Sequence, residues 1–427
     1  MTDQAVNVRA LSLELLLEIT EKKAYSHIVL RGALERYQYL GKQDRAFLTR
    51  LTEGTVERML ELDHIIGQYS KVPVKKLKPM IRGILRLSVY QLRYMDRIPA
   101  SAVCNEAVRL AGKKGFGNLK GFVNGVLRSI VRELDEITCA EPWIQYSTPK
   151  WIVDQWTEEY GEETALRMLQ SQYEERPLTV RVNVQKITRE GLMERITKEG
   201  VHAKKVEGLD CALAISDYDY LRAIPSFREG LFQVQDVSSM RAALLAAPKP
   251  GDYCIDVCAA PGGKSLHLAE LLQGTGFVEA RDLTEEKVSL IEENRVRCGA
   301  SNVRAVRMDA TVLHEASIQK ADIVLADLPC SGLGVLGKKR DLKYRMSREQ
   351  QKELAELQRT ILHTVWQYVK PGGTLLYSTC TVHKEENQAN TEWFLAHHPF
   401  LLKEQVQLLP GMGLWDGFYI AKMERTT

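Results

Sequence analysis

Two cysteines follow runs of apolar residues, in positions where a thiol can act on a bound molecule. Residues 322–327 read as a buried strand that leads to Cys330, and residues 374–379 read as another that leads to Cys380. Open α/β sheets bind ligands at the carboxyl ends of their strands, so both thiols are expected at that edge. A thiolate there can serve as a covalent nucleophile. The competing interpretation of either cysteine alone is a small buried apolar residue.

A glycine turn supplies the second part of the predicted site. An apolar run, 253–257, leads into the turn 258–264, and a helical pattern follows it. The glycines let the backbone approach a ligand closely, and the N–H groups at the helix start favour anionic or polar ligand groups. Asp282 ends the next apolar run, where α/β nucleotide folds place the carboxylate that binds ribose hydroxyls. Together these features predict an adenosine-type ligand.

Three motifs make the prediction specific. CAAPGGK spans 258–264, DLPCSG spans 327–332 and YSTC spans 377–380, in this order along the chain. This set resembles the RNA cytosine-5 methyltransferases that use S-adenosylmethionine. Over its whole length the chain is similar to the Sun/RsmB family of bacterial 16S rRNA enzymes, whose site is cytosine 967.

The resemblance implies a role for each of several residues. C5 of a pyrimidine is a poor nucleophile until a thiolate adds to C6, and a base must later remove the C5 proton. Cys380 matches the family's nucleophile, and Cys330 matches the cysteine that assists breakdown of the covalent adduct. Asp327 is expected to hydrogen-bond the cytosine. The residues expected to bind S-adenosylmethionine are Cys258, Ala259, Ala260, Pro261, Gly262, Gly263, Lys264, Asp282, Asp309 and Asp327.

Some assignments have a plain alternative. DNA cytosine-5 methyltransferases place their nucleophile in a Pro-Cys dipeptide, which Pro329-Cys330 mimics, but the pair of motifs favours the RNA enzymes and the later cysteine. Asp309 is expected at the adenine amino group, and the alternative is an aspartate that caps its own loop. Arg281 stands where a small or apolar residue is commoner and is expected to alter how the cofactor's edge is held.

Composition limits the class of protein. The 427 residues are 44% hydrophobic and 26% charged, as in an ordinary globular protein of two or three domains. No apolar run is long enough to span a membrane, and the N-terminus lacks a secretory pattern. The eight cysteines form no C-x-x-C pair, which argues against a metal site or a disulfide framework and for the reducing cytoplasm.

The net charge of +3 conceals an uneven distribution. Residues 1–140 hold 23 Lys and Arg against 15 Asp and Glu, and within 71–130 the numbers are 13 against 2. Such clustering indicates a polyanion partner, although a solubilising surface is the alternative. The basic side chains of this region include Lys71, Lys75, Lys76, Lys78, Arg82, Arg86, Arg93, Lys113, Lys114, Lys120 and Arg128.

The chain is predicted to be multidomain. Apolar residues at helical spacing predict an all-α bundle over 1–140, and by resemblance it is a NusB-like RNA-binding domain. Residues 141–236 are expected to form a connector and a small α+β module, ferredoxin-like in the family, in which Arg181 and Asn183 are candidates to face RNA. Residues 237–427 alternate strands and helices and predict a doubly wound, Rossmann-like methyltransferase domain, with 418–423 as an antiparallel edge strand. The basic stretch 338–345 is expected to hold RNA beside the flipped base, and a solvated loop is the alternative.

The combined prediction is a cytoplasmic, S-adenosylmethionine-dependent methyltransferase that acts on cytosine in 16S rRNA, naked or in a small-subunit assembly intermediate. No membrane or DNA partner is expected. Two alternatives stay open at this point. One is a tRNA cytosine-5 methyltransferase, and the other is an RNA-binding assembly factor whose methyltransferase fold is inert. The intact Cys330, Cys380 and Asp327 argue against the inert protein, because a pure binder does not need them.

Overall fold

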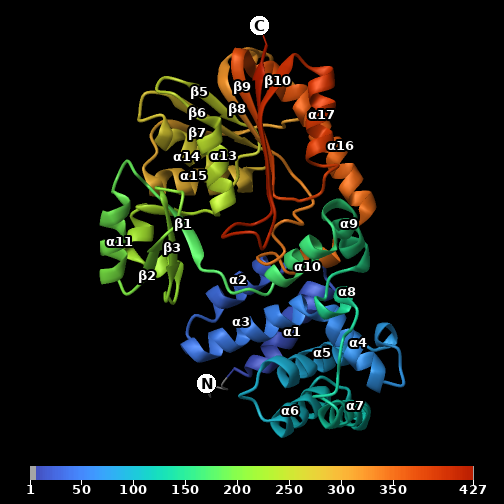
Figure 1. The fold of residues 1–427 in the computed structure, drawn as a ribbon. Helices are drawn as coiled ribbons and strands as arrows, with labels where there is room; N and C mark the ends of the chain where they lie inside the picture. The colour runs from blue at the N-terminus through green and yellow to red at the C-terminus, as the bar shows by residue number, and fades with distance from the viewer. Residues whose placement is uncertain (1–5, 427) are drawn as a thin grey trace. The chain divides into compact units, whose positions relative to one another are not determined.

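The computed structural model describes residues 6–426 (Figure 1). Its internal contacts divide the chain into two compact units. The helical unit holds the described residues up to Leu169 together with Leu336–Arg345, and the sheet unit holds Gln170–Val335 together with the described residues from Met346 onwards. Within the described residues, no helix is both long enough and apolar enough to cross a lipid bilayer.

The helical unit is a bundle around a single apolar core. Its central helix carries an almost continuous buried face from Ile81 to Gln91, flanked by helices whose apolar residues recur every three or four positions. The predicted all-α region is therefore confirmed. Its helices are α1 (Val8–Thr20), α2 (Ser26–Arg36), α3 (Lys42–Glu57), α4 (Met59–Tyr69), α5 (Pro79–Tyr94), α6 (Ala100–Lys113), α7 (Lys120–Arg132), α8 (Pro142–Gln145), α9 (Lys150–Tyr160) and the start of α10 (Glu162–Ser171).

The segment Leu336–Arg345 packs into this bundle, so the expectation that 338–345 holds RNA is wrong for the buried Asp341 and Lys343, whereas Lys338 and Lys339 are exposed. Asp341 is buried and accepts hydrogen bonds from the Ser26 hydroxyl at 2.5 Å and the Ser26 N–H at 3.2 Å. Lys343 is also buried, and Arg340 pairs with Glu53 and Glu57. Arg340 and Asp341 therefore have their partners within the helical unit, and the sequence of the basic stretch alone does not show this.

The sheet unit begins with a four-stranded antiparallel sheet in the order β2-β3-β1-β4. Apolar residues alternate at Leu178, Val180 and Val182 and mark the strand β1, whereas β2 is short and polar and carries no such pattern. The predicted ferredoxin-like fold is confirmed. Its elements are β1 (Leu178–Val182), α11 (Arg189–Lys198), β2 (His202–Lys205), β3 (Ala212–Ser216), α12 (Pro225–Arg228) and β4 (Phe232–Val234).

The second sheet has seven strands in the order β10-β11-β9-β8-β5-β6-β7. The five strands from β9 to β7 are parallel, and β10 and β11 extend the sheet in antiparallel fashion. The strands are β5 (Tyr253–Asp256), β6 (Phe277–Asp282), β7 (Val303–Arg307), β8 (Ala321–Asp327), β9 (Val369–Thr379), β10 (Phe400–Leu408) and β11 (Phe418–Arg425).

Helices cover both faces of this sheet, as Figure 1 shows. Alternate residues of each central strand point to opposite faces, so one apolar cluster joins the sheet to α13, α14 and α15 and another joins it to α16 and α17. The predicted doubly wound domain is confirmed. The helices are α13 (Val237–Ala246), α14 (Gly263–Leu271), α15 (Glu285–Cys298), α16 (Arg348–Val365) and α17 (Gln388–His397).

One detail of the predicted sheet is wrong. The strand at 418–423 was expected at the edge, but β11 lies between β9 and the unexpected strand β10, which is the true edge. The middle of β10, from Leu401 to Gln405, is exposed and largely polar. Such a sequence has no apolar alternation to mark it as a strand, and polar residues are typical of a protected sheet edge.

Candidate active site

The turn after β5 is shaped by one glycine. Gly262 has a φ of +99°, in the left-handed region that residues with side chains rarely adopt, and its N–H donates to the Ala259 carbonyl at 2.6 Å. The next residue begins α14, whose first-turn N–H groups have no acceptors within the helix. The turn 258–264 therefore presents backbone donors at the carboxyl edge of the sheet.

Asp282 ends β6 and is buried beside this turn. Its Oδ2 accepts a hydrogen bond from the Ala260 N–H at 2.9 Å, and its Oδ1 accepts one from the Leu283 N–H at 2.8 Å. Lys287 Nζ lies 2.9 Å from Oδ1, and half of that lysine side chain is exposed. Because half of this lysine side chain is in solvent, its ammonium can move into water when a ligand hydroxyl takes its place beside Asp282.

Lys264 connects the turn to the next strand. Its Nζ donates to Asp327 Oδ2 at 2.6 Å, and Asp327 Oδ1 accepts from the Ser378 hydroxyl at 2.7 Å. Asp327 and Ser378 lie opposite each other in the parallel register of β8 and β9. The three side chains thus connect the turn 258–264 to the strand that leads to Cys380.

The two predicted cysteines meet at this edge. Cys330 Sγ and Cys380 Sγ are 3.4 Å apart, and both residues are partly exposed. Cys380 also packs against the apolar cluster that contains Ala259 and Ala260. Cys380 is also near enough to Lys264, at the end of the turn 258–264, for its charge to raise the pKa of that lysine.

The ionisable groups of the site differ in how their surroundings shift their pKa values. Burial alone would lower the pKa of Lys264, but the negative charges of Asp327, Asp256 and Cys380 outweigh it, and the pKa is raised. The hydrogen bond with Cys380, burial, and the charges of Cys380, Glu386 and Asp327 raise the pKa of Cys330, which holds its proton. Burial likewise raises the pKa of Cys258, so that thiol is a poor nucleophile.

Asp256, the last residue of β5, tests whether the site suits a cationic ligand. It is buried, its Oδ2 accepts from the Ser265 hydroxyl at 2.6 Å, and within the described chain its Oδ1 has no hydrogen-bond partner. Burial raises its pKa to about 7. A carboxyl group that holds its proton up to about pH 7 and whose oxygens are enclosed does not pair with a cationic ligand, so the fit to S-adenosylmethionine rests on the backbone donors of the turn and on Asp282.

Asp309 is exposed, and its Oδ1 accepts from the Thr311 N–H at 2.8 Å and the Thr311 hydroxyl at 2.7 Å. These bonds lower its pKa. The loop-capping alternative therefore describes what Asp309 does in this structure, and its contact with adenine stays a prediction.

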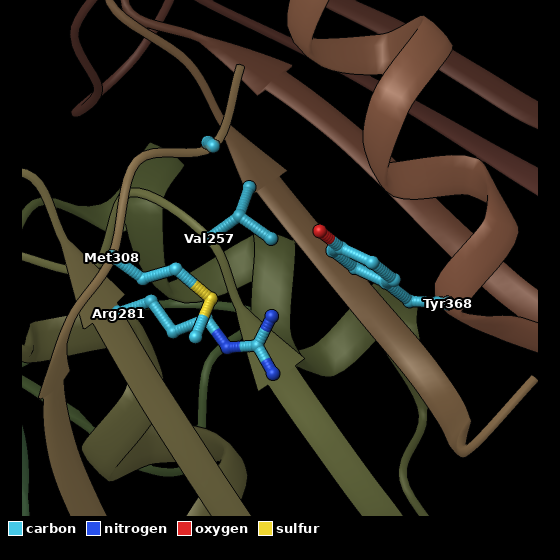
Figure 2. Close-up of a pocket in the computed structure, with 5 residues that line it drawn as sticks. Val257, Arg281, Met308 and Tyr368 are labelled. Atoms are coloured by element: carbon cyan, nitrogen blue, oxygen red, sulfur yellow. The ribbon is translucent and has the colours of Figure 1, made fainter. Parts of the chain in front are cut away.

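A small hollow lies at the ends of β5, β6 and the segment after β7, lined by Val257, Arg281, Met308, Ala310 and Tyr368 (Figure 2). Arg281 and Asp282 are neighbours in β6, so they point to opposite faces. The guanidinium of Arg281 lies 5.2 Å from the centre of the Tyr368 ring and donates to the Ser317 hydroxyl at 2.6 Å. Arg281 thus supports the strand from the face opposite Asp282.

The expectation that Arg181 and Asn183 face RNA is wrong. Both are buried. Arg181 pairs with Glu270 of α14 and donates to Gln235 Oε1 at 2.7 Å, and Asn183 donates to the carbonyls of Gly230 and Cys298 at 3.0 Å each. The strand β1 is covered on both faces, so polar residues on it are not evidence of an exposed face.

Several residues around the cysteines were not predicted from the sequence. Ser378 and Thr381 lie within two positions of Cys380, and Asn387 lies six positions from Thr381, so their proximity was a usable signal. Glu386 and Gln358 gave no local signal, because their contacts with the Cys330 loop join residues 55 and 29 positions apart.

Comparison with known proteins decides the family. The profile of the 16S rRNA methyltransferase RsmB/F family matches residues 243–424, the NusB family profile matches 6–132, and the ferredoxin-like domain profile of RsmF/B-like methyltransferases matches 148–218. The probable ribosomal RNA small subunit methyltransferase B of Bacillus subtilis (strain 168) is 34% identical, covering 98% of this chain and 99% of that protein. The chain belongs to the RsmB family. The predicted class, a 16S rRNA methyltransferase with a NusB-like domain, is confirmed by this membership.

Solved structures agree with the RsmB family fold. The crystal structure of PH0851 superposes with a TM-score of 0.84 at 25% identity, covering 99% of this chain and 100% of that one. NSun6 from Pyrococcus horikoshii, solved with SFG, superposes with a TM-score of 0.60 at 25% identity, covering 65% of this chain and 98% of that one. The order of helical region, small module and methyltransferase sheet is therefore shared along nearly the whole length of the first of these structures.

Proposed function

We propose that this RsmB family member transfers a methyl group from S-adenosylmethionine to C5 of a cytosine in 16S rRNA, at the family's cytosine 967 site, through a covalent bond between Cys380 and C6. The observation that carries the proposal is the 3.4 Å separation of the Cys330 and Cys380 sulfurs beside the Lys264–Asp327 pair. A nucleophile, a proton-holding partner and a cation meet at one edge of the sheet.

The proposed cofactor residues are those of the turn 258–264 together with Asp282, Asp309 and Asp327. S-adenosylmethionine supplies an electrophilic methyl group when it is bound. The backbone donors of the turn suit its carboxylate, and Asp282 suits its ribose hydroxyls.

The proposed reaction uses three side chains. Cys380 attacks C6 as a thiolate, which forms the S–C6 bond and moves the C5=C6 electron pair to C5, where the methyl group is accepted. Asp327 hydrogen-bonds the cytosine, held by Lys264 and Ser378. A water molecule takes the C5 proton, and C5=C6 is restored as the S–C6 bond breaks and its electron pair returns to the Cys380 sulfur. Cys330, whose raised pKa keeps it protonated, assists this release at the neighbouring sulfur.

The remaining assignments rest on family membership and composition. The proposed substrate form is 16S rRNA, naked or in a small-subunit assembly intermediate, and the proposed location is the cytoplasm. The proposed divisions are an RNA-binding domain over 1–140, a connector and module over 141–236 and the methyltransferase domain over 237–427.

The first prediction separates the roles of the two cysteines. Cys380→Ala is expected to lose at least about 100-fold in methylation rate because the covalent step is lost. Cys330→Ala is expected to accumulate a covalent RNA adduct, visible as a slower band on a denaturing gel. Cys139→Ala, a partly exposed cysteine of the helical unit, is the matched control. A Cys380→Ala protein that methylates at the normal rate contradicts the proposed mechanism.

Bisulfite mapping of total RNA from cells with and without the protein identifies the substrate. Loss of one modified cytosine in 16S rRNA supports the proposal. Loss of a modified cytosine in a tRNA instead would identify the protein as a tRNA cytosine-5 methyltransferase. An unchanged map together with a defect in small-subunit assembly would identify it as an inert assembly factor.

A further inference from the structure

A buried network of polar side chains surrounds both cysteine loops. Its members from three different elements are fully buried: Gln358 of α16, Tyr377 of β9, and the consecutive residues Glu386 and Asn387 just before α17. Buried polar groups are costly unless their hydrogen bonds are satisfied, so a network of this size beside a reactive site requires an explanation.

Glu386 and Gln358 hold the backbone on either side of Cys330. Glu386 Oε2 accepts from the Ser331 N–H at 2.8 Å, and Glu386 Oε1 accepts from the Ser331 hydroxyl at 2.5 Å. Gln358 Nε2 donates to the Pro329 carbonyl at 2.9 Å and to Glu386 Oε2 at 3.1 Å. The residue before Cys330 and the residue after it are thus fixed by one connected pair of side chains.

Asn387 does the same for Cys380. Its Oδ1 accepts from the Thr379 hydroxyl at 2.6 Å, and its Nδ2 donates to the Thr381 carbonyl at 3.1 Å. Thr379 and Thr381 are the two neighbours of Cys380 in the chain. A hydrogen bond of 2.8 Å between the hydroxyls of Ser331 and Thr381 then joins the two loops directly.

We propose that Glu386 and Asn387 are positioning residues of the two-cysteine site, with Glu386 fixing the loop of Cys330 and Asn387 fixing the loop of Cys380. The proposal rests on the proposed methyl transfer for its catalytic meaning. Because the two residues are consecutive, a single rigid turn sets the distance between the sulfurs. Three groups donate to the Glu386 carboxyl, the Ser331 N–H, the Ser331 hydroxyl and the Gln358 amide, and they oppose the rise in its pKa that burial causes.

The first test needs neither RNA nor turnover. Iodoacetamide alkylation of each cysteine in the full-length protein is followed by peptide mass spectrometry. In Glu386→Ala the Cys330 loop is released and a negative charge beside its thiol is removed, so Cys330 is expected to react about fivefold faster or more while Cys380 changes less than about twofold. Asn387→Ala is expected to give the reverse pattern. Glu385→Ala, which removes an adjacent but exposed carboxylate, is expected to change neither.

Glu386→Gln keeps the volume of the side chain and guards against a variant that does not fold. Its amide can still accept from Ser331 but points a donor at another donor, so the same asymmetry is expected with a smaller amplitude. Equal alkylation of Cys330 in the wild type, Glu386→Gln and a folded Glu386→Ala protein, as judged by circular dichroism, would overturn the proposal.

The second test asks whether positioning matters for catalysis. Glu386→Gln is expected to lower kcat about tenfold or more with the KM for RNA within about twofold, because misplacement of a reacting group acts on the chemical step. It should also accumulate the covalent adduct, as expected for Cys330→Ala, whereas Asn387→Ala should form less adduct. If the wild type and Cys330→Ala form no adduct at all, the proposed methyl transfer fails while the alkylation pattern still tests the positioning. If adducts form and resolve normally in both variants, the positioning fails alone.

Discussion

At position 256 a carboxyl group is buried where β5 meets the turn 258–264, close to the charge of Asp327. Burial raises its pKa from 3.8 to about 7. A carboxyl group with this property binds a proton in the folded state over a pH range in which the unfolded chain has already lost it. The acidic end of the sheet therefore carries fewer negative charges at neutral pH than its sequence suggests.

The prediction at this scale concerns the pH dependence of stability. Between about pH 4 and pH 7 the folded state binds the additional proton, so this group lowers the free energy of unfolding as pH rises, by an amount on the order of a few kcal/mol over the whole range. The substitution Asp256→Asn removes this pH-dependent contribution to the free energy of unfolding. The unfolding free energy of the variant minus that of the wild type should therefore increase from pH 4 to pH 7 and then level off, as measured by urea unfolding of the sheet unit's signal. A difference that is constant with pH would contradict the raised pKa.

At the scale of the elements, the segment Leu336–Arg345 begins only six positions after Cys330 and is packed in the helical unit. Asp341 keeps this segment in the helical unit, because it accepts a hydrogen bond from Ser26 and forms an ion pair with Arg345 at 2.6 Å. Tyr344 adds hydrogen bonds to the carbonyls of Glu57 and Ser147, both at 2.9 Å. The chain that leaves one cysteine loop is thus fixed at its far end by buried contacts with helices from the beginning of the sequence.

Asp341→Ala is expected to destabilise the helical unit by about 3 kcal/mol, because it leaves the buried Ser26 groups without their acceptor and removes the carboxylate that pairs with Arg345, which keeps only its backbone acceptors at Lys23 and Ala24. Trypsin should then cleave faster after the exposed Lys338 and Lys339, which limited proteolysis with mass spectrometry detects. Asp135→Ala, at an exposed aspartate of the same unit, is the control. Equal cleavage rates in both variants would show that Asp341 does not hold the segment.

The same scale shows what could be predicted from the sequence. Cys330 and Cys380 were predicted to meet because parallel strands end at one edge of a sheet, a rule that needs only the order of apolar runs. Arg181 was misjudged because strand alternation does not tell which faces other elements cover. Asp341 and Glu386 could not be found from local patterns, because their partners are 315 and 55 positions away and only the folded chain brings them together.

At the scale of the whole molecule, the basic residues of the helical unit include some that form ion pairs and others that are exposed. Arg82, Arg86, Arg93 and Lys114 pair with acidic side chains and serve the bundle itself. Lys71, Lys75, Lys76 and Lys78 are exposed on the short segment between α4 and α5. Only side chains of the second kind are available to phosphates, so the charge count of the sequence overstates the RNA-binding surface.

Replacement of Lys71, Lys75, Lys76 and Lys78 by glutamine is expected to weaken binding of 16S rRNA fragments at all sequences alike, because lysine contacts to phosphate carry little sequence information. Each lost phosphate contact reduces the slope of log affinity against log salt concentration by about 0.7 to 0.9, so four contacts reduce it by about 3. The slope is obtained from filter-binding affinities measured at salt concentrations from about 50 to about 300 mM. The matched control replaces four exposed lysines of the sheet unit, Lys198, Lys204, Lys320 and Lys352. If both sets reduce the slope equally, RNA is attracted by net charge alone, and the basic segment between α4 and α5 has no special part in binding.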